Sequence, residues 1–239
     1  MSRGKGVPKM PLLIVALLVG LAQPAASQVQ RKTFQGPDGG TILYGLSIPR
    51  DYDPGHPRPL VLALHPGGTK TPYYGVQYMA NIFLPGLRGL DPIMVAPDCP
   101  TAAWSDPAAE KAVMAVIDKV RGEYAVDPRR IVVVGFSLGG RGTWFMASRH
   151  QDLFTGAIVM AGATDEPLER LGKIPTYVIH SRADERVPFA QAEKRATDLD
   201  RLGRPVKFEA IEDVGHFDMT SYLPALRRAG QWVSERWPR

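Results

Sequence analysis

The chain has 239 residues, of which 44% are apolar and 22% are charged, a composition typical of a globular protein. This composition excludes the disordered, collagen-like and membrane-embedded classes for the chain as a whole. The only cysteine, Cys99, excludes an intramolecular disulfide, and we expect it to be a small buried packing residue.

The first 27 residues have the order of a secretory signal peptide. Three basic residues come first, an apolar run spans residues 12–22, and Ala25-Ala26-Ser27 supplies small residues for cleavage. The apolar run is shorter than the ~20 residues of a membrane-spanning helix, so an uncleaved anchor is the alternative and not the expectation. We therefore predict a secreted or periplasmic protein with a signal peptide over residues 1–27 and one domain over residues 28–239.

Much of the net positive charge of the chain comes from this first segment. The chain carries 29 basic and 24 acidic side chains, and residues 1–27 hold three of the basic ones and none of the acidic ones. The remainder therefore has a net charge of only +2, without a run of clustered Lys or Arg. We expect no nucleic-acid partner.

Short apolar runs alternate with amphipathic stretches along the rest of the chain. A first strand is expected at residues 41–48, and the continuous apolar run at residues 60–64 predicts a strand that is buried on both faces. Further strands of this kind are expected at residues 93–96, 131–134, 157–160 and 177–179, and a last strand at residues 206–211.

Three helices are predicted between these strands. Asp106 is the expected N-cap of the first, which runs to about Tyr124. The second has an apolar face that includes Leu202 and ends at Gly203, and the third covers about residues 222–233. This alternation predicts an α/β fold with a mostly parallel central sheet and helices on both faces. Ligands of such sheets bind beyond the carboxyl ends of the strands, so catalytic residues should directly follow a strand.

A candidate nucleophile follows one of these strands. Gly135-Phe136-Ser137-Leu138-Gly139 is a G-x-S-x-G pattern between the strand at residues 131–134 and a helical stretch. The serine has to project from a sharp, strained turn, and glycines on both sides avoid collisions with the neighbouring strand and helix. The N-terminus of the helix points its N–H groups to where negative charge develops in acyl transfer. We therefore predict Ser137 as the nucleophile, the alternative being a glycine-rich turn with an incidental serine.

The base for this serine is predicted to be His216. It follows the last strand, and Gly215 gives its loop the freedom to turn the imidazole inward. His56 lies upstream in a proline-rich turn, and His150 ends the helix after the nucleophile, several turns away. His180 follows a strand and either supports the acid loop or packs in the core.

The imidazole needs a carboxylate that fixes its tautomer and stabilises its charged form. Asp184 follows the penultimate strand and gives the order Ser, Asp, His along the chain. Asp165, which follows the preceding strand, is the alternative acid. Glu185 is expected to point elsewhere, and Glu212 and Asp213 lie too near the base in the chain to orient it easily.

Two backbone N–H groups are expected to stabilise the oxyanion. One belongs to Leu138, the residue after the nucleophile. The second is expected in the loop His65-Pro66-Gly67-Gly68, which follows the strand at residues 60–64. Because proline has no N–H, Gly67 is the predicted donor and Gly68 is the next candidate. The alternative is a plain glycine turn.

No metal or cofactor is predicted. The histidines are scattered, there is no second cysteine, and the sequence contains no phosphate-binding glycine loop with a lysine.

Together, these motifs resemble the α/β-hydrolase superfamily over about residues 44–232. Within it, the chain is similar to compact exported esterases and predicted peptidases related to feruloyl esterases, polyhydroxybutyrate depolymerases and the phospholipase/carboxylesterase group. The matching stretches are residues 59–68, 126–131, 135–140, 184–188 and 215–216. The resemblance places Ser137, Asp184 and His216 at the triad positions and Gly67 and Leu138 at the oxyanion positions. The loop departs from many relatives by reading His-Pro-Gly-Gly instead of His-Gly.

The resemblance also implies a substrate class. Residues 162–175 contain no insertion large enough for a lid domain, so an open cleft is expected near Trp104, Phe136 and Phe217, the candidate substrate-binding residues. Each of these aromatic side chains can equally belong to the core. The implied reaction is hydrolysis of short-chain or aromatic carboxylic esters, on small molecules or polymers, through an acyl-enzyme on Ser137. A serine peptidase is the first alternative, and a non-catalytic exported binding protein is the second.

Overall fold

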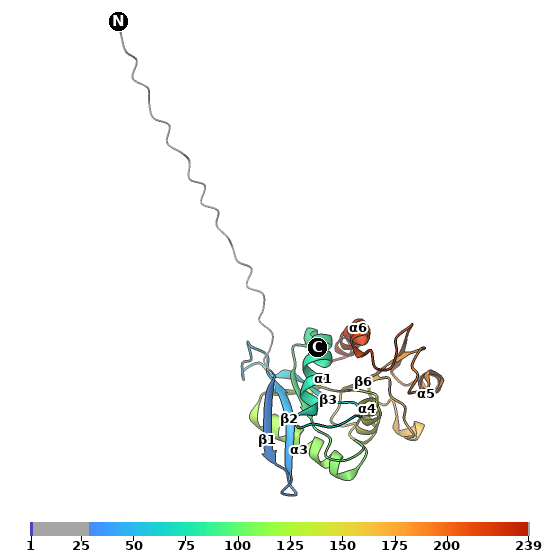
Figure 1. The fold of residues 1–239 in the computed structure, drawn as a ribbon, viewed down its shortest axis with the longest axis horizontal. Coiled ribbons are helices and arrows are strands. Elements are labelled where there is room, and N and C mark those ends of the chain that lie inside the picture. The colour runs from blue at the N-terminus through green and yellow to red at the C-terminus, as the bar shows by residue number, and fades with distance from the viewer. Residues whose placement is uncertain (2–28, 239) are drawn as a thin grey trace.

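The computed structural model describes residue 1 and residues 29–238, and within them eight strands form a single sheet (Figure 1). The predicted signal peptide lies outside the described residues. The strands are β1 Gln30–Gln35, β2 Thr41–Ser47, β3 Arg58–Leu64, β4 Ile93–Pro97, β5 Val126–Phe136, β6 Gly156–Met160, β7 Thr176–Ser181 and β8 Val206–Ile211.

The order of the strands across the sheet is β1-β2-β4-β3-β5-β6-β7-β8. β1 and β2 pair antiparallel with their neighbours, whereas β4 and all the strands beyond it run parallel. β4, the next strand along the chain after β3, pairs with one edge of β3, and β5 pairs with the opposite edge. This reversal is a topological switch point, and in open α/β sheets ligands bind beyond the carboxyl ends of the strands at such a point, here β3 and β5.

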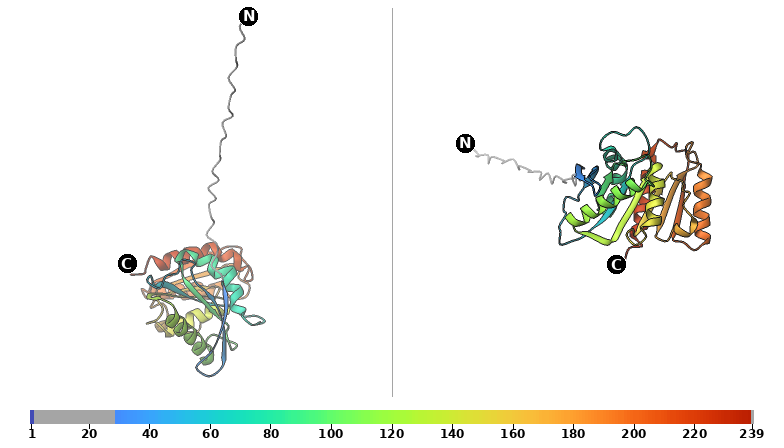
Figure 2. Two further views of the ribbon diagram at one scale, coloured as in Figure 1. Left: turned by 90° about the vertical axis from the view of Figure 1, so that its left-hand side faces the viewer. Right: turned by 90° about the horizontal axis from the view of Figure 1, so that it is seen from below.

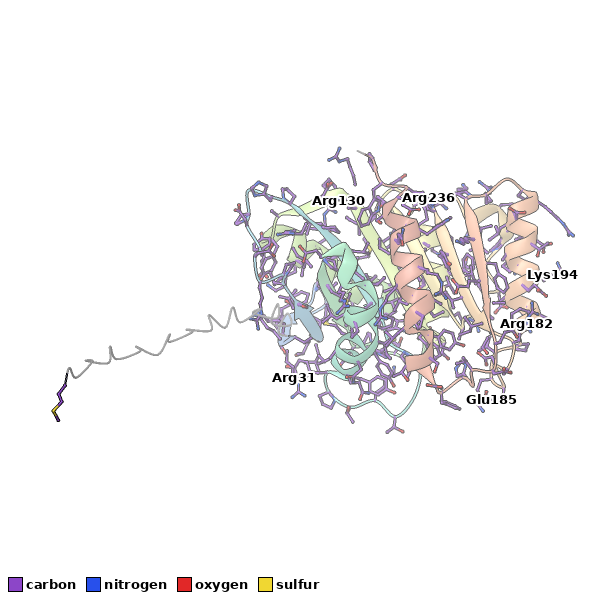
Figure 3. All side chains as sticks on the ribbon, turned by 90° about the horizontal axis from the view of Figure 1, so that it is seen from above. Arg31, Arg130, Arg182, Glu185, Lys194 and Arg236 are labelled. Carbon is purple, nitrogen blue, oxygen red and sulfur yellow. The ribbon has the colours of Figure 1, made fainter. Side chains whose placement is uncertain are left out.

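Helices cover both faces of the sheet. Figure 2 (left) shows α6 and α1 above the sheet and α3 and α4 below it, and Figure 3 shows the helical segment after β3 lying beside α6. One face carries α1 Tyr74–Tyr78, the π-helix η1 Met79–Phe83, α2 Leu84–Leu87 and α6 Leu223–Ser234. The other face carries α3 Pro107–Glu123, α4 Leu138–Arg149 and α5 Phe189–Arg201. Single turns of 3-10 helix occur at Arg88–Leu90, Leu168–Arg170 and Met219–Tyr222.

The strand periodicity explains this two-sided core. Leu60, Leu62 and Leu64 of β3 pack with α3 and α4, while Val61 and Ala63, one residue out of phase, pack with α2 and α6. All five side chains are fully buried, as expected for a continuous apolar run with layers on both faces. Cys99 is also buried, as its sequence setting predicts.

The predicted α/β fold, with a mostly parallel sheet and helices on both faces, is confirmed, with four local differences. β1 was not predicted, because its alternation is weak and most of its residues are exposed. The helical segment from Tyr74 was not predicted either, because Pro85 and several glycines interrupt its apolar periodicity. Asp106 occupies the N-cap position, but its side chain makes no capping hydrogen bond. Leu202 is 56% exposed and does not belong to the buried face of α5.

Between β6 and β7, residues 161–175 contain only the 3-10 turn Leu168–Arg170, so this connection holds no lid domain. Among the described residues, no helix combines the length and apolar character that crossing a membrane requires.

α4 packs closely against the end of β3. A Cβ atom on Gly139 would overlap the backbone carbonyl of Leu64, so only glycine lets the helix approach the strand this closely. The N-terminus of α4 therefore sits directly against the carboxyl edge of the sheet.

Gly139→Ala is expected to destabilise the protein by about 1–3 kcal/mol, because the backbone of α4 has to move away from β3. Gly122→Ala on α3 is the matched control, since a Cβ there meets nothing within 4 Å, and alanine should be stabilising by up to about 1 kcal/mol. Urea unfolding of both variants measures the difference. Equal free energies of unfolding would contradict this account of the packing.

Candidate active site

The turn between β5 and α4 holds the predicted nucleophile in a strained conformation. Ser137 has a φ of 55° and a ψ of −115°, and its N–H donates to the carbonyl of Met160 over 2.9 Å. A residue other than glycine with positive φ carries about 1–3 kcal/mol of strain, which surrounding packing has to offset. A Cβ on Gly135 would overlap the backbone of Gly139, so the predicted need for glycine on both sides of the turn is confirmed.

The structure brings the three predicted triad residues into one hydrogen-bonded chain. The Ser137 hydroxyl lies 2.8 Å from Nε2 of His216, and Nδ1 of His216 lies 2.8 Å from Oδ2 of Asp184. An ionised carboxylate only accepts, so Nδ1 carries the proton and Nε2 presents a lone pair to the serine hydroxyl. The chain can therefore accept a proton from Ser137 onto a correctly oriented imidazole.

The carboxylate of Asp184 is buried and fully hydrogen-bonded. Its side chain has no exposed surface, and its Oδ1 accepts from the N–H groups of Arg186 and Val187 over 2.9 and 2.8 Å. Burial raises the pKa of Asp184, but hydrogen bonds from His216 and these two N–H groups outweigh it and hold the pKa below its ordinary value. The carboxylate is therefore ionised at neutral pH. It accepts hydrogen bonds from these partners, but no proton is transferred to it.

Glu185 does not point away from the site, contrary to the sequence expectation. Its Oε2 accepts a hydrogen bond from the backbone N–H of His216 over 2.9 Å, and this bond lowers the pKa of Glu185. Figure 3 shows Glu185 and Arg182 in the loop that follows β7. Two consecutive acidic residues thus hold His216. Asp184 hydrogen-bonds the imidazole ring of His216, and Glu185 hydrogen-bonds its backbone N–H.

The competing residues lie elsewhere. Asp165 is largely exposed and forms an ion pair with Arg141, so the structure does not bring the alternative acid to His216. His56 pairs with Asp53 on the surface, and His150 lies 2.8 Å from a carboxylate oxygen of Glu110. Of the other histidines considered as the base, only His180 lies near the three triad residues, with its Nε2 3.4 Å from Oδ2 of Asp184.

The predicted oxyanion donors lie beside each other. A Cβ on Gly67 would lie 3.6 Å from the side chain of Leu138, so the loop after β3 runs next to the first residue of α4. The N–H of Leu138 has no partner within the helix, since the first turn of a helix leaves its N–H groups free. Gly67 is exposed, so its backbone is open to solvent and to a ligand.

Sequence reasoning missed the residue that anchors this loop, His65. It is fully buried, and its Nδ1 donates to the carbonyl of Pro66 over 2.7 Å while its Nε2 accepts from the N–H of Cys99 over 3.0 Å. Trp104 donates its indole N–H to the carbonyl of His65 over 3.1 Å. Burial lowers the pKa of His65, which keeps the ring neutral and able to make both bonds. In the sequence, the signal that could have indicated this role was the place of the histidine, between the end of the buried strand and Pro66.

Two of the three candidate substrate-binding residues are not accessible. Trp104 is 1% exposed and Phe136 is 2% exposed, so both are core residues, and the prediction that they contact a substrate is corrected. Trp104 packs against His65, and the Phe136 ring packs against His216 at 5.2 Å.

The third candidate, Phe217, is 72% exposed, and its ring lies 5.4 Å from the His216 ring. It borders a groove of about 370 Å³ between the helical segment after β3 and the loop after β8. The groove is lined by apolar and polar side chains, namely Gln77, Tyr78, Asn81, Ile82, Phe217, Asp218, Met219 and Thr220. Among the described residues, no cluster of His, Cys, Asp or Glu side chains has the arrangement of a metal site.

One known protein family matches this chain. Residues 101–222, about half of the chain and the part that contains Ser137, Asp184 and His216, match the dienelactone hydrolase family. The chain belongs to this family. Its sheet order and its strand–turn–helix site are those of an α/β-hydrolase.

Similar proteins include esterases. The protein NocK of Nocardia uniformis subsp. tsuyamanensis is 30% identical over 158 residues, which cover 62% of this chain and 46% of NocK. Feruloyl esterase C of Emericella nidulans is 28% identical over 165 residues, 61% of this chain and 56% of that protein. The chain thus matches about half the length of these relatives. The crystal structure of a thermostable esterase superposes with a TM-score of 0.75 at 28% identity, over 87% of this chain and 62% of the other.

The buried neutral imidazoles make stability depend on pH. Burial lowers the pKa of both His65 and His180 below the value of about 6.5 that they have in the unfolded chain. Below about pH 6.5 the unfolded state therefore binds protons that the folded state does not, and stability falls as the pH drops. We expect the free energy of unfolding to decrease from pH 7 to pH 5.5 by up to about 1 kcal/mol per histidine.

Urea unfolding at these two pH values measures the effect. His180→Gln should reduce the pH dependence, because it removes one of the two buried imidazoles whose pKa is lowered by burial. A free energy of unfolding that does not change over this range would contradict the assignment of neutral buried imidazoles.

Proposed function

We propose that this protein is an exported serine hydrolase that cleaves carboxylic esters through an acyl-enzyme on Ser137. The observation that carries the proposal is the hydrogen-bonded chain from Ser137 through His216 to Asp184, at the carboxyl edge of the sheet. A nucleophile held at positive φ next to an oriented base is costly to maintain, and a protein that only binds a ligand has no use for it. Membership of the dienelactone hydrolase family and the esterases among its relatives support hydrolysis of an ester bond.

The proposed reaction begins with attack of the Ser137 oxygen on the ester carbonyl carbon. The hydroxyl proton passes to Nε2 of His216, and the N–H groups of Leu138 and Gly67 stabilise the oxyanion. His216 then gives this proton to the departing alcohol, and the acyl group stays on the serine. Water attacks the acyl-enzyme and gives a proton to Nε2 of His216. The bond between the acyl carbon and the serine oxygen then breaks, His216 returns the proton to that oxygen, and the acid leaves. Asp184 stabilises the imidazolium in both halves.

The groove beside Phe217 supports the choice of short or aromatic acyl groups. One of its lining residues, Phe217, lies against the His216 ring, and its other lining residues include Tyr78, Ile82 and Met219, which suit a flat or small apolar group. The absence of a lid between β6 and β7 leaves the site open to solvent on that side. An open site can also accept an ester that is attached to a polymer. Export rests on the order of residues 1–27 and is part of the same proposal.

Ser137→Ala should abolish ester hydrolysis, with a loss in turnover on the order of 10⁶, while the fold is retained. The measurement is hydrolysis of p-nitrophenyl acetate by the purified variant, with thermal unfolding as the control for folding. Asp165→Asn serves as the matched control, because Asp165 lies in an exposed ion pair and should leave turnover nearly unchanged. Wild-type activity in Ser137→Ala would refute the proposed mechanism.

Substrate class is tested by comparing kcat/KM for acetyl, butyryl, octanoyl and feruloyl esters and for a peptide. We expect the acetyl, butyryl and feruloyl esters to exceed the octanoyl ester and the peptide by about tenfold or more. Phe217→Ala should lower kcat/KM for the feruloyl ester more than for the acetyl ester. Leu202→Ala, at another exposed apolar position, is the control and should change neither. A preference for the peptide would replace esterase by peptidase and leave the role of Ser137 intact.

A further inference from the structure

His180, at the end of β7, is a buried titratable side chain that the proposed reaction does not use. It has no exposed surface, and its ring packs edge-on against Phe189 with 6.1 Å between centroids. Its Nε2 lies 3.4 Å from Asp184, and the charges of Asp184 and His216, the acid and the base of the proposed triad, both act on it. Its position therefore links a core histidine directly to the acid loop, which we define as residues 181–188.

The contacts of His180 fix where its proton resides. Its Nε2 lies 2.9 Å from the carbonyl oxygen of Val187 and 3.4 Å from Oδ2 of Asp184. Both oxygens only accept hydrogen bonds, so Nε2 carries the hydrogen. Its Nδ1 is buried and has no partner among the described residues. Burial lowers the pKa of His180, so the ring is neutral and Nδ1 bears a lone pair.

The same bond shapes the surroundings of the acid. Val187 is held on both sides, because its N–H donates to Oδ1 of Asp184 over 2.8 Å and its carbonyl accepts from His180. Oδ2 of Asp184 lies between Nδ1 of His216 at 2.8 Å and Nε2 of His180 at 3.4 Å. Rotation of the carboxylate away from His216 would break the bonds to the loop backbone and remove the contact with His180.

We propose that His180 is a positioning residue for Asp184: its Nε2–H closes the acid loop on Val187 and holds the carboxylate in the orientation that His216 requires. This inference rests on the proposed function of Asp184 as the acid of a serine hydrolase. A histidine that only filled space would be replaceable by an apolar side chain without an effect on turnover. A positioning role instead requires a hydrogen-bond donor at Nε2 that reaches the carbonyl of Val187.

The test uses two substitutions at this position. His180→Leu keeps much of the apolar volume but removes the donor, whereas the side-chain amide of His180→Gln supplies an N–H at the position of Nε2. We expect His180→Leu to lower kcat for p-nitrophenyl acetate on the order of 10²-fold at unchanged KM, because a small displacement of the acid misaligns the base. His180→Gln should restore kcat to within a few-fold of the wild type.

A double-mutant cycle with Asp184→Asn separates positioning from stability. If His180 acts through Asp184, His180→Leu has little further effect in the Asp184→Asn background. An equal loss in both backgrounds, or no difference between the leucine and glutamine variants, would overturn the inference. Thermal unfolding of every variant shows that kcat is measured on folded protein.

A second measurement does not require turnover. NMR of protein containing isotope-labelled histidine reports the Nδ1–H proton of His216, which the bond to Asp184 protects from exchange with water. We expect this signal to persist in the wild type and in His180→Gln and to be lost in His180→Leu. Persistence in His180→Leu would overturn the positioning role. Absence of ester hydrolysis by the wild type would instead refute the proposed function, so the two failures are distinguishable.

Discussion

The path of the chain from β5 into α4 is the constraint on which the rest of this structure depends. β5 is buried between two layers of helices, and the chain turns into α4 at the single residue Ser137, which takes a φ of 55°. Gly135 and Gly139 permit the turn, because any side chain there would overlap neighbouring backbone. The same turn exposes the serine hydroxyl at the carboxyl edge of the sheet and sets Leu138 beside the loop after β3. The positions of the serine hydroxyl and of the backbone N–H groups beside it thus follow from one packing requirement.

Burial of polar groups near this turn is tolerated because each has defined partners. The Asp184 carboxylate has no exposed surface, yet it faces two backbone N–H groups and two imidazoles. Two further histidines, His65 and His180, are kept neutral by burial, and each fixes a loop through a backbone carbonyl. One loop carries Gly67 and the other carries the acid. The acceptor and donor groups are therefore positioned by fixed dipoles, which is the arrangement that stabilises developing charge without reorganisation.

The fold places these groups but does not choose a substrate. α/β-hydrolase sheets support cleavage of more than one kind of bond, so fold and family membership define the reaction class, and the loops around the strand ends define the specificity. Here the relevant surface is the groove between the helical segment after β3 and the loop after His216, where Phe217 is exposed. Its aromatic, aliphatic and amide side chains are the basis of the proposed preference for small or flat groups.

The sequence by itself determined the features that depend on local pattern. Continuous apolar runs predicted five strands of a mostly parallel sheet, and G-x-S-x-G between a strand and a helix predicted the turn at Ser137, because both signals come from neighbouring residues. Chain order pointed to Asp184 and His216, but only the tertiary structure separated Asp184 from Asp165, which an ion pair with Arg141 holds at the surface. Tertiary structure alone also buried two of the three candidate aromatic residues, Trp104 and Phe136, and turned Glu185 towards the backbone of His216. It also decided between the two alternatives for His180 by placing its ring beside Asp184. These outcomes depend on which loops meet at the edge of the sheet, and contacts between residues distant in the chain leave no periodicity in the sequence.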